Sequence, residues 1–207
     1  MPVTDRILSA IRDQITEGRL PPGTALVEQE WTQALDVSRN TLREAFRLLC
    51  REGLAVHFRH RGVVVRSLTR QDVRDIYRVR RTLELQALSR DEPFEENELG
   101  AMRDAVAQAE AAAEVGDWRT VGTHSLLFHR YIVTTLQSPL IDAFFKTILA
   151  QLRLVFASAP DERRFQKPWV VKDRRILQSI EAGQFVVAHE RLTEYLTQSE
   201  HALLDHI

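Results

Sequence analysis

Apolar residues recur at helical spacing through the N-terminal part of the chain. They predict three helices, over residues 4–17, 28–35 and 38–52. The third helix has the clearest apolar stripe, formed by Leu42, Ala45, Phe46 and Leu49. Ser38 is placed to cap this helix, and Gly53 follows it as a residue that accepts the backbone conformation of a helix end.

After Gly53 the period of the pattern changes from helical to extended. Residues 54–58 and 63–66 predict two short strands around the turn Arg59-His60-Arg61-Gly62. Three helices followed by a two-stranded hairpin is the element order of a winged helix-turn-helix. We therefore expect this DNA-binding fold over residues 1–66.

The remainder of the chain has a helical pattern throughout. After a linker at residues 67–70, we expect six helices, near residues 70–90, 94–115, 117–136, 138–158, 168–182 and 184–206. The break before the fifth of these runs from Ala159-Pro160 to Pro168. The overall prediction is a mainly α fold, with an antiparallel all-helical bundle over residues 71–207 that has its own core.

Charge is distributed unevenly between the two predicted domains. The whole chain has a net charge of −1, yet residues 36–70 hold 8 Arg against 3 acidic residues. Residues 71–207 hold 17 basic and 21 acidic residues. A basic segment on an acidic body favours binding to a polyanion, although a solvated charged face would give the same counts.

The sequence offers no sign of secretion or of a membrane span. Cys50 is the single cysteine, so a disulfide within the chain is excluded. The first residues lack the apolar core of a signal peptide, and no apolar stretch approaches the length of a transmembrane helix. We therefore expect a cytoplasmic protein with no membrane partner.

The polar face of the third helix has the chemistry of a DNA contact. Arg39, Asn40 and Arg43 lie opposite the apolar stripe, and Arg and Asn are the side chains best suited to guanine and adenine. The hydroxyls of Ser38 and Thr41 can bind phosphates at the helix start. The wing turn Arg59-His60-Arg61-Gly62 adds two guanidiniums and a Gly that permits close approach to a backbone. A surface helix with solvated arginines is the alternative.

These residues also carry a resemblance to a known family. The segments GRLPPG, VSR-x-TLREA-x-RLL and EGL, with RG in the wing, resemble the DNA-binding domain of GntR-type regulators. The resemblance implies operator contacts by the seven residues of the helix start and the wing, which are Ser38, Arg39, Asn40, Thr41, Arg43, Arg61 and Gly62. Two positions depart from the family pattern: Asp36 replaces the usual Gly, and Gln29 replaces an Arg that often contacts DNA.

The helical part is similar to the effector (FCD-like) domain of the FadR-like branch of that family, through IYRVRRTLE, LLFHRYIV and RILQSIEAG. Six helices resemble its VanR-like subgroup. In many members of the branch one Asp or Asn and three His hold a divalent metal. The corresponding positions here are Ser125, His129, Asp173 and Tyr195. Only His129 and Asp173 are plausible ligands, so we expect no metal and no other cofactor.

Periodicity independently favours a polar pocket inside the bundle. Five polar residues fall on otherwise apolar helix faces, namely Arg80, Ser125, His129, Asp173 and Tyr195. Burying a polar group without a partner costs about 1–3 kcal/mol, so such residues bind either a ligand or one another. We expect an effector pocket in which Arg80 binds the carboxylate of an organic acid. The alternative for Arg80 is an internal pair with Glu84, one turn away.

Three functions compete at this point. The first is a homodimeric transcription regulator, most simply a repressor, that binds an inverted-repeat operator under the control of a small effector. The second is a DNA-binding dimer whose helical domain is purely structural. The third is a helical enzyme that uses His129 and Asp173. The sequence contains no nucleophile motif or phosphate-binding loop that would support it. We therefore expect no catalytic residues.

Overall fold

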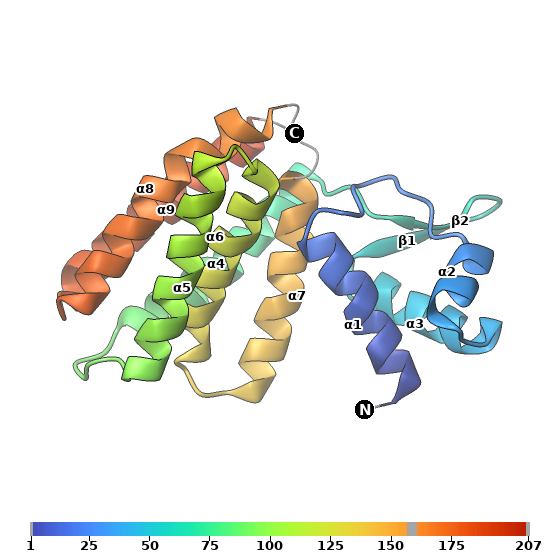
Figure 1. Cartoon of the computed structure of the whole chain (residues 1–207), viewed down its shortest axis with the longest axis horizontal. Coiled ribbons are helices and arrows are strands. Elements are labelled where there is room, and N and C mark those ends of the chain that lie inside the picture. Colours follow the sequence, from blue (N-terminus) through green and yellow to red (C-terminus); the bar gives the residue numbers. More distant parts are fainter. Residues whose placement is uncertain (1, 157–160, 206–207) are drawn as a thin grey trace.

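The computed structural model describes residues 2–156 and 161–205. In chain order, its elements are α1 (Val3–Thr16), α2 (Glu28–Leu35), α3 (Arg39–Arg51), β1 (Ala55–Phe58), β2 (Gly62–Val65), α4 (Arg70–Leu88), α5 (Glu96–Glu114), α6 (Trp118–Thr134), α7 (Pro139–Phe156), α8 (Glu162–Glu181) and α9 (Phe185–Leu204). The first three helices and the hairpin form one lobe, and the six long helices form the other (Figure 1). This arrangement confirms the predicted winged helix-turn-helix and helical bundle.

The wing is a two-stranded antiparallel sheet. Ala55 of β1 pairs with Val65 of β2, and Phe58 pairs with Gly62. The prediction placed Gly62 in the turn, whereas the structure makes it the first residue of β2. The turn itself has positive φ at His60 (76°) and at Gly62 (72°), a conformation that costs Gly little. The tip of the wing is therefore the Arg59–Arg61 segment.

The sharp turn between α2 and α3 depends on Asp36. This residue takes the left-handed conformation, with φ 50° and ψ 56°. Asp and Asn are the non-glycine residues that tolerate this conformation best, because their short polar side chains bond locally. The replacement of the family's Gly by Asp36 therefore leaves the helix-turn-helix geometry intact.

Each lobe has its own apolar core, and helix α7 contributes to both. The N-terminal core contains Ile7, Leu8, Ile11 and Ile15 of α1, with Leu42, Ala45, Phe46 and Leu49 of α3. Ala150 and Leu154 of α7 belong to this same core. The opposite side of α7, including Phe145 and Leu152, packs into the bundle. Helix α7 thus joins the two lobes through their cores (Figure 1), and Thr123 of α6 adds a hydrogen bond to the carbonyl oxygen of Thr16.

Helix α8 differs from its prediction. We predicted that it begins at Pro168, but it begins at Glu162, where the Asp161 side chain accepts a hydrogen bond from the backbone N–H of Arg164 (3.0 Å). Pro168 lies inside the helix and removes one backbone N–H from its hydrogen bonds, which costs stability. The burial of Phe165 and Trp169, on either side of Pro168, offsets this cost. The predicted helix ends at residues 158 and 206, and the Ala159-Pro160 break, lie outside the described residues.

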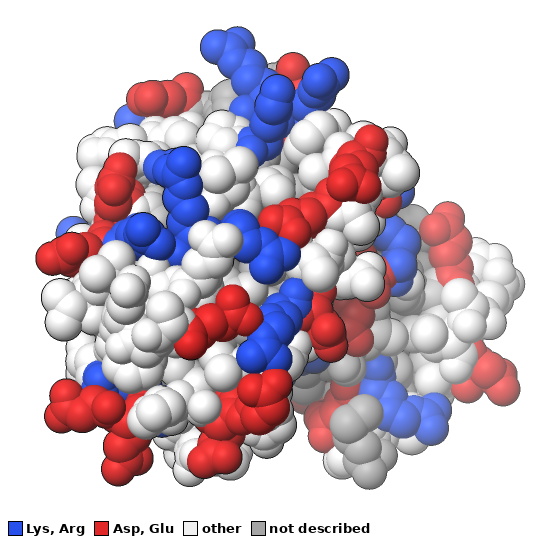
Figure 2. All heavy atoms as spheres, turned by 60° about the vertical axis from the view of Figure 1, so that its left-hand side comes forward, with Lys and Arg blue, Asp and Glu red and all other residues white. Residues whose placement is uncertain are grey.

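The outer face of the bundle is held by ion pairs between helices. Arg103 of α5 contacts Glu96 on its own helix and Glu181 of α8, at 2.5 and 2.6 Å. Arg174 of α8 pairs with Glu110 of α5. Figure 2 shows basic and acidic side chains next to one another over this face. Among the described helices, none combines the length and the apolar character needed to cross a membrane.

Candidate nucleic-acid interface and buried polar cluster

Helix α3 begins with a hydrogen-bonded cap. The Ser38 hydroxyl accepts a hydrogen bond from the backbone N–H of Thr41 (3.1 Å), and the two hydroxyl oxygens lie 2.7 Å apart. The cap fixes the first turn of the helix, from which Arg39 and Asn40 project into solvent. The opposite face is anchored by Leu42 and other fully buried residues. The structure thus brings the predicted contact residues of α3 together on one exposed face.

Two of the α3 arginines form ion pairs. Nε of Arg43 donates to Oε1 of Glu28 at 2.7 Å, which joins α3 to α2. The hydrogen bond lowers the pKa of Glu28, and the carboxylate raises the pKa of Arg43, so both groups stay charged. Nη1 of Arg47 donates to Oε2 of Glu44 at 3.0 Å on the same helix. Arg39 forms no ion pair among the described residues.

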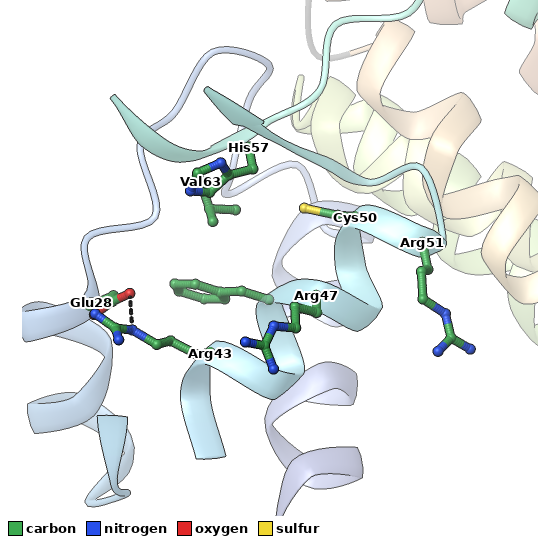
Figure 3. A pocket seen from close by; sticks show the side chains of 8 residues that line it. Glu28, Arg43, Arg47, Cys50, Arg51, His57 and Val63 are labelled. Carbon is green, nitrogen blue, oxygen red and sulfur yellow. Dashed lines mark hydrogen bonds and ion pairs between the residues drawn. The ribbon is translucent and has the colours of Figure 1, made fainter. Parts of the chain in front are cut away.

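A hollow of about 680 Å³ lies on the surface between helix α3 and the wing. Arg43, Arg47 and Arg51 line its helix side, with Phe46 and Cys50, whereas His57 and Val63 line its wing side (Figure 3). Glu28 is the single carboxylate among its lining residues. Burial raises the pKa of the Cys50 thiol, so Cys50 stays neutral here. Three guanidiniums around one carboxylate make this surface attractive to phosphate.

The wing residues Arg61 and Gly62 are exposed at the hairpin. The backbone N–H of Arg61 donates to the carbonyl oxygen of Phe58 (3.2 Å), which closes the turn. A Cβ added at Gly62 would meet no atom within 4 Å, so Gly62 is needed for its positive φ of 72° and not for space within the chain.

The bundle interior holds a chain of charged side chains contributed by three helices. Arg80 and Glu84 of α4 are 1% and 0% exposed, and Nε of Arg80 donates to Oε1 of Glu84 at 2.6 Å. The other carboxylate oxygen lies 2.6 Å from Nδ1 of His129, on α6. Nε2 of His129 lies 3.4 Å from Oδ1 of Asp173, on α8. The order is therefore Arg80, Glu84, His129, Asp173.

This chain of charges sets the protonation of its members. Burial would raise the pKa of Glu84, but the Arg80 guanidinium, assisted by His129, holds it below its ordinary value. Burial would likewise lower the pKa of His129, but the Glu84 carboxylate raises it above its ordinary value. Arg80 and Glu84 therefore remain an ion pair in the interior. The internal pair considered for Arg80 in the sequence is present in the structure.

Ser125 and Tyr195 complete the predicted set. Their hydroxyl oxygens lie 3.3 Å apart, and the Tyr195 ring is 4.6 Å from the His129 ring and 5.0 Å from that of Trp169. Burial raises the pKa of Tyr195 well above its ordinary value, so its hydroxyl stays protonated. All five effector residues predicted from the sequence thus lie in one connected cluster of contacts.

Several buried polar atoms of this region have no hydrogen-bond partner among the described residues. They are Nε2 of His129 and both carboxylate oxygens of Asp173, of which Nε2 and Oδ1 approach each other at 3.4 Å as a charge contact only, together with Nε1 of Trp169, Nε2 of Gln166 and the Tyr77 hydroxyl. The sequence analysis did not name Trp169, Tyr77 or Gln166 as site residues. A buried Trp or Tyr ordinarily uses its polar atom, which is the signal that could have identified both aromatic residues.

Comparison with known proteins identifies the chain. The model of the bacterial regulatory proteins of the gntR family matches residues 3–65, and the FCD domain model matches residues 75–198. The chain belongs to the GntR family. A GntR regulator from Rhodococcus sp. RHA1 has 33% sequence identity and a TM-score of 0.91, with 99% of this chain and 98% of that chain covered.

A further relative agrees with this assignment, and a solved structure shares the fold. A protein of Paenarthrobacter nicotinovorans named "Probable D-xylose utilization operon transcriptional repressor" is 28% identical over 92% of this chain and 85% of its own length. McbR/YncC of E. coli shares the fold, with 18% identity and a TM-score of 0.84 over 99% and 98% of the two chains. Members of the GntR family are transcriptional regulators and not enzymes, so this chain is a transcriptional regulator.

The metal set implied by the family resemblance can be tested against the geometry of this GntR regulator. Its four positions do lie together, but Ser125 and Tyr195 face each other as neutral hydroxyls. Only His129 and Asp173 remain as plausible ligands, fewer than a divalent metal normally needs. In the described part of the chain, no group of three or more His, Cys, Asp or Glu is arranged to hold a metal ion. The residues present do not fit a divalent metal.

Proposed function

We propose that this regulator binds a double-stranded operator as a homodimer, and that a small effector bound in the helical domain controls its affinity for DNA. The observation that carries this proposal is the pairing of two features in one chain. Helix α3 presents unburied arginines beside the wing, and the bundle buries polar atoms that have no hydrogen-bond partner in the described part of the chain. The first feature suits a polyanion, and the second suits a small polar ligand.

In this proposal the seven predicted residues contact the operator. Arg39, Asn40 and Arg43 approach base edges, because they project from the start of α3. Ser38 and Thr41 bind phosphates at the N-terminus of the helix. Arg61 and Gly62 contact the adjoining DNA backbone or groove from the wing.

The effector is bound by Arg80, Ser125, His129, Asp173 and Tyr195. Because Glu84 already balances the charge of Arg80, a carboxylate on the ligand gains less there than the sequence suggested. The Asp173 carboxylate oxygens instead favour a ligand with hydroxyl donors. A sugar or a hydroxylated organic acid supplies such hydroxyl groups. The relative named for D-xylose utilization supports this class.

Dimerisation is assigned to the helical domain, with domain boundaries at residues 1–66 and 71–207 and a linker at 67–70. Leu140 and Phe144, one turn apart on α7, are 84% and 51% exposed. Large apolar side chains exposed together mark an interaction surface. A two-fold dimer presents two α3 helices to successive major grooves, so the operator is an inverted repeat. Sedimentation velocity of the full chain should detect a dimer that Leu140→Glu weakens.

A thermal-shift screen of the full chain with sugars and hydroxy acids tests effector binding. A ligand that prefers the folded state raises the melting temperature by mass action. A true effector should lose this effect in Asp173→Asn and should change operator affinity in the wild type. A compound that stabilises both proteins equally binds elsewhere. If no such compound stabilises the wild type, the alternative of a purely structural helical domain is favoured.

A further inference from the structure

The Arg43–Glu28 pair leaves the DNA-facing part of the guanidinium available. Glu28 bonds to Nε, and neither Nη1 nor Nη2 of Arg43 has a partner among the described residues. Figure 3 shows the pair at the edge of the hollow between α3 and the wing. We propose that Glu28 is a positioning residue that holds Arg43 for bidentate contact with one guanine, and so sets base preference at that position. The inference rests on the proposed DNA contact of Arg43.

The argument begins with the geometry of the guanidinium. Its five N–H donors are arranged in a rigid planar fork, so fixing Nε also fixes the direction of Nη1 and Nη2. Those two nitrogens match O6 and N7 of guanine in the major groove. A side chain that is already held loses less rotamer freedom on binding, which favours the one base whose acceptors lie where the fork points.

Arg47 provides a contrast on the same helix. Its bond to Glu44 uses Nη1, so one of the two nitrogens needed for a bidentate contact is already engaged. Its partner also lies on α3 itself, three residues away, whereas Glu28 holds Arg43 from a second helix. Arg47 is therefore suited to a phosphate and Arg43 to a base.

The negative charge of Glu28 also opposes DNA binding. A carboxylate at the DNA face repels phosphates, so it weakens binding to every sequence alike. Its benefit beside Arg43 is therefore expected in discrimination between bases and not in affinity. Charge and positioning can be separated by variants, because Gln keeps an acceptor for Nε without the charge.

The test is selection of duplexes from a random library by the full-length wild type, Arg43→Ala, Glu28→Ala, Glu28→Gln and Glu30→Ala. Glu30 is the matched control, since it is exposed on α2 and forms no ion pair among the described residues. We expect Glu28→Ala to reduce preference about tenfold at the position that Arg43→Ala flattens. Glu28→Gln should retain part of it, and Glu30→Ala should keep it while binding all duplexes more tightly.

The inference is overturned if Glu28→Ala keeps the wild-type preference, or if it changes the profile no more than Glu30→Ala does. Thermal melting of each variant verifies that its fold is retained. If the wild type selects a motif that Arg43→Ala leaves unchanged, Arg43 contacts no base and the inference fails with that assignment. If the wild type selects no motif, the DNA-binding proposal itself fails.

Discussion

Arginine has two different environments in this protein. On α3, Arg39 and Arg43 are exposed, and their terminal nitrogens have no partners among the described residues. In the bundle, Arg80 is buried and bonded to Glu84, which in turn contacts His129. An arginine side chain is therefore available to a partner at Arg39 and Arg43 and committed to an internal partner at Arg80.

This difference shows what burial does to a charge. An exposed guanidinium keeps its hydration until DNA replaces it, so it costs the fold little. A buried guanidinium must be compensated within the protein, because removing a charge from water is expensive. In the proposed function the charges on α3 bind DNA, whereas the Arg80–Glu84 pair stabilises the fold and leaves Asp173 and His129 for the proposed ligand.

The largest expected effect is on stability and comes from the buried pair. Glu84→Ala leaves the Arg80 guanidinium buried without its carboxylate and should lower the free energy of unfolding by about 3–5 kcal/mol. Urea unfolding followed by circular dichroism measures it. Asp75→Ala is the control, since it removes a carboxylate from an exposed pair with Arg78 (2.6 Å) and should cost less than about 1 kcal/mol. Equal losses would remove the distinction between the two environments.

The next effect is on operator affinity. Arg39→Ala should weaken binding to the selected duplex by about 1–3 kcal/mol, because a base contact is lost, and should change binding to scrambled DNA much less. Fluorescence anisotropy titrations measure both. Arg74→Ala removes the same charge from an exposed position on α4. If the two variants weaken binding alike, the effect is one of net charge and Arg39 has no specific role.

A smaller effect is expected from Arg47, whose terminal nitrogen is bonded to Glu44. Arg47→Ala should weaken binding to selected and scrambled duplexes equally, and should reduce the slope of log affinity against log salt by about 1. A salt titration on each duplex provides this slope. A change of base preference in Arg47→Ala would show that it contacts a base.

The smallest effect is a separation of two histidine titrations. Burial lowers the pKa of His124, whereas Glu84 raises that of His129 against the effect of burial. His129 therefore stabilises the fold fully below its unfolded pKa of about 6.5, and this contribution is lost as the pH rises through the higher folded value. Nitrogen-15 NMR of labelled histidines should find His129 above and His124 below the ordinary value. The reverse order would contradict the assigned charge on Glu84.

The fold was largely predictable because apolar residues repeat with different periods in helices and strands. The ends of most elements are also marked by Gly, Pro or a capping residue. The start of α8 was not, because Pro168 normally ends a helix and its tolerance depends on tertiary packing around Phe165 and Trp169. The exposed face of α3 followed from its period. The order of contacts from Arg80 to Asp173 could not be predicted from the sequence, because it depends on how three helices pack against one another.

The central proposal is that α3 and the wing bind a specific DNA sequence. The most direct test compares the affinity of the full-length wild type for its selected duplex with that for a scrambled duplex of the same composition, at one salt concentration. We expect the selected duplex to contain an inverted repeat and to bind about a thousandfold or more tightly than the scrambled one. Equal affinity for the two duplexes would contradict the proposal.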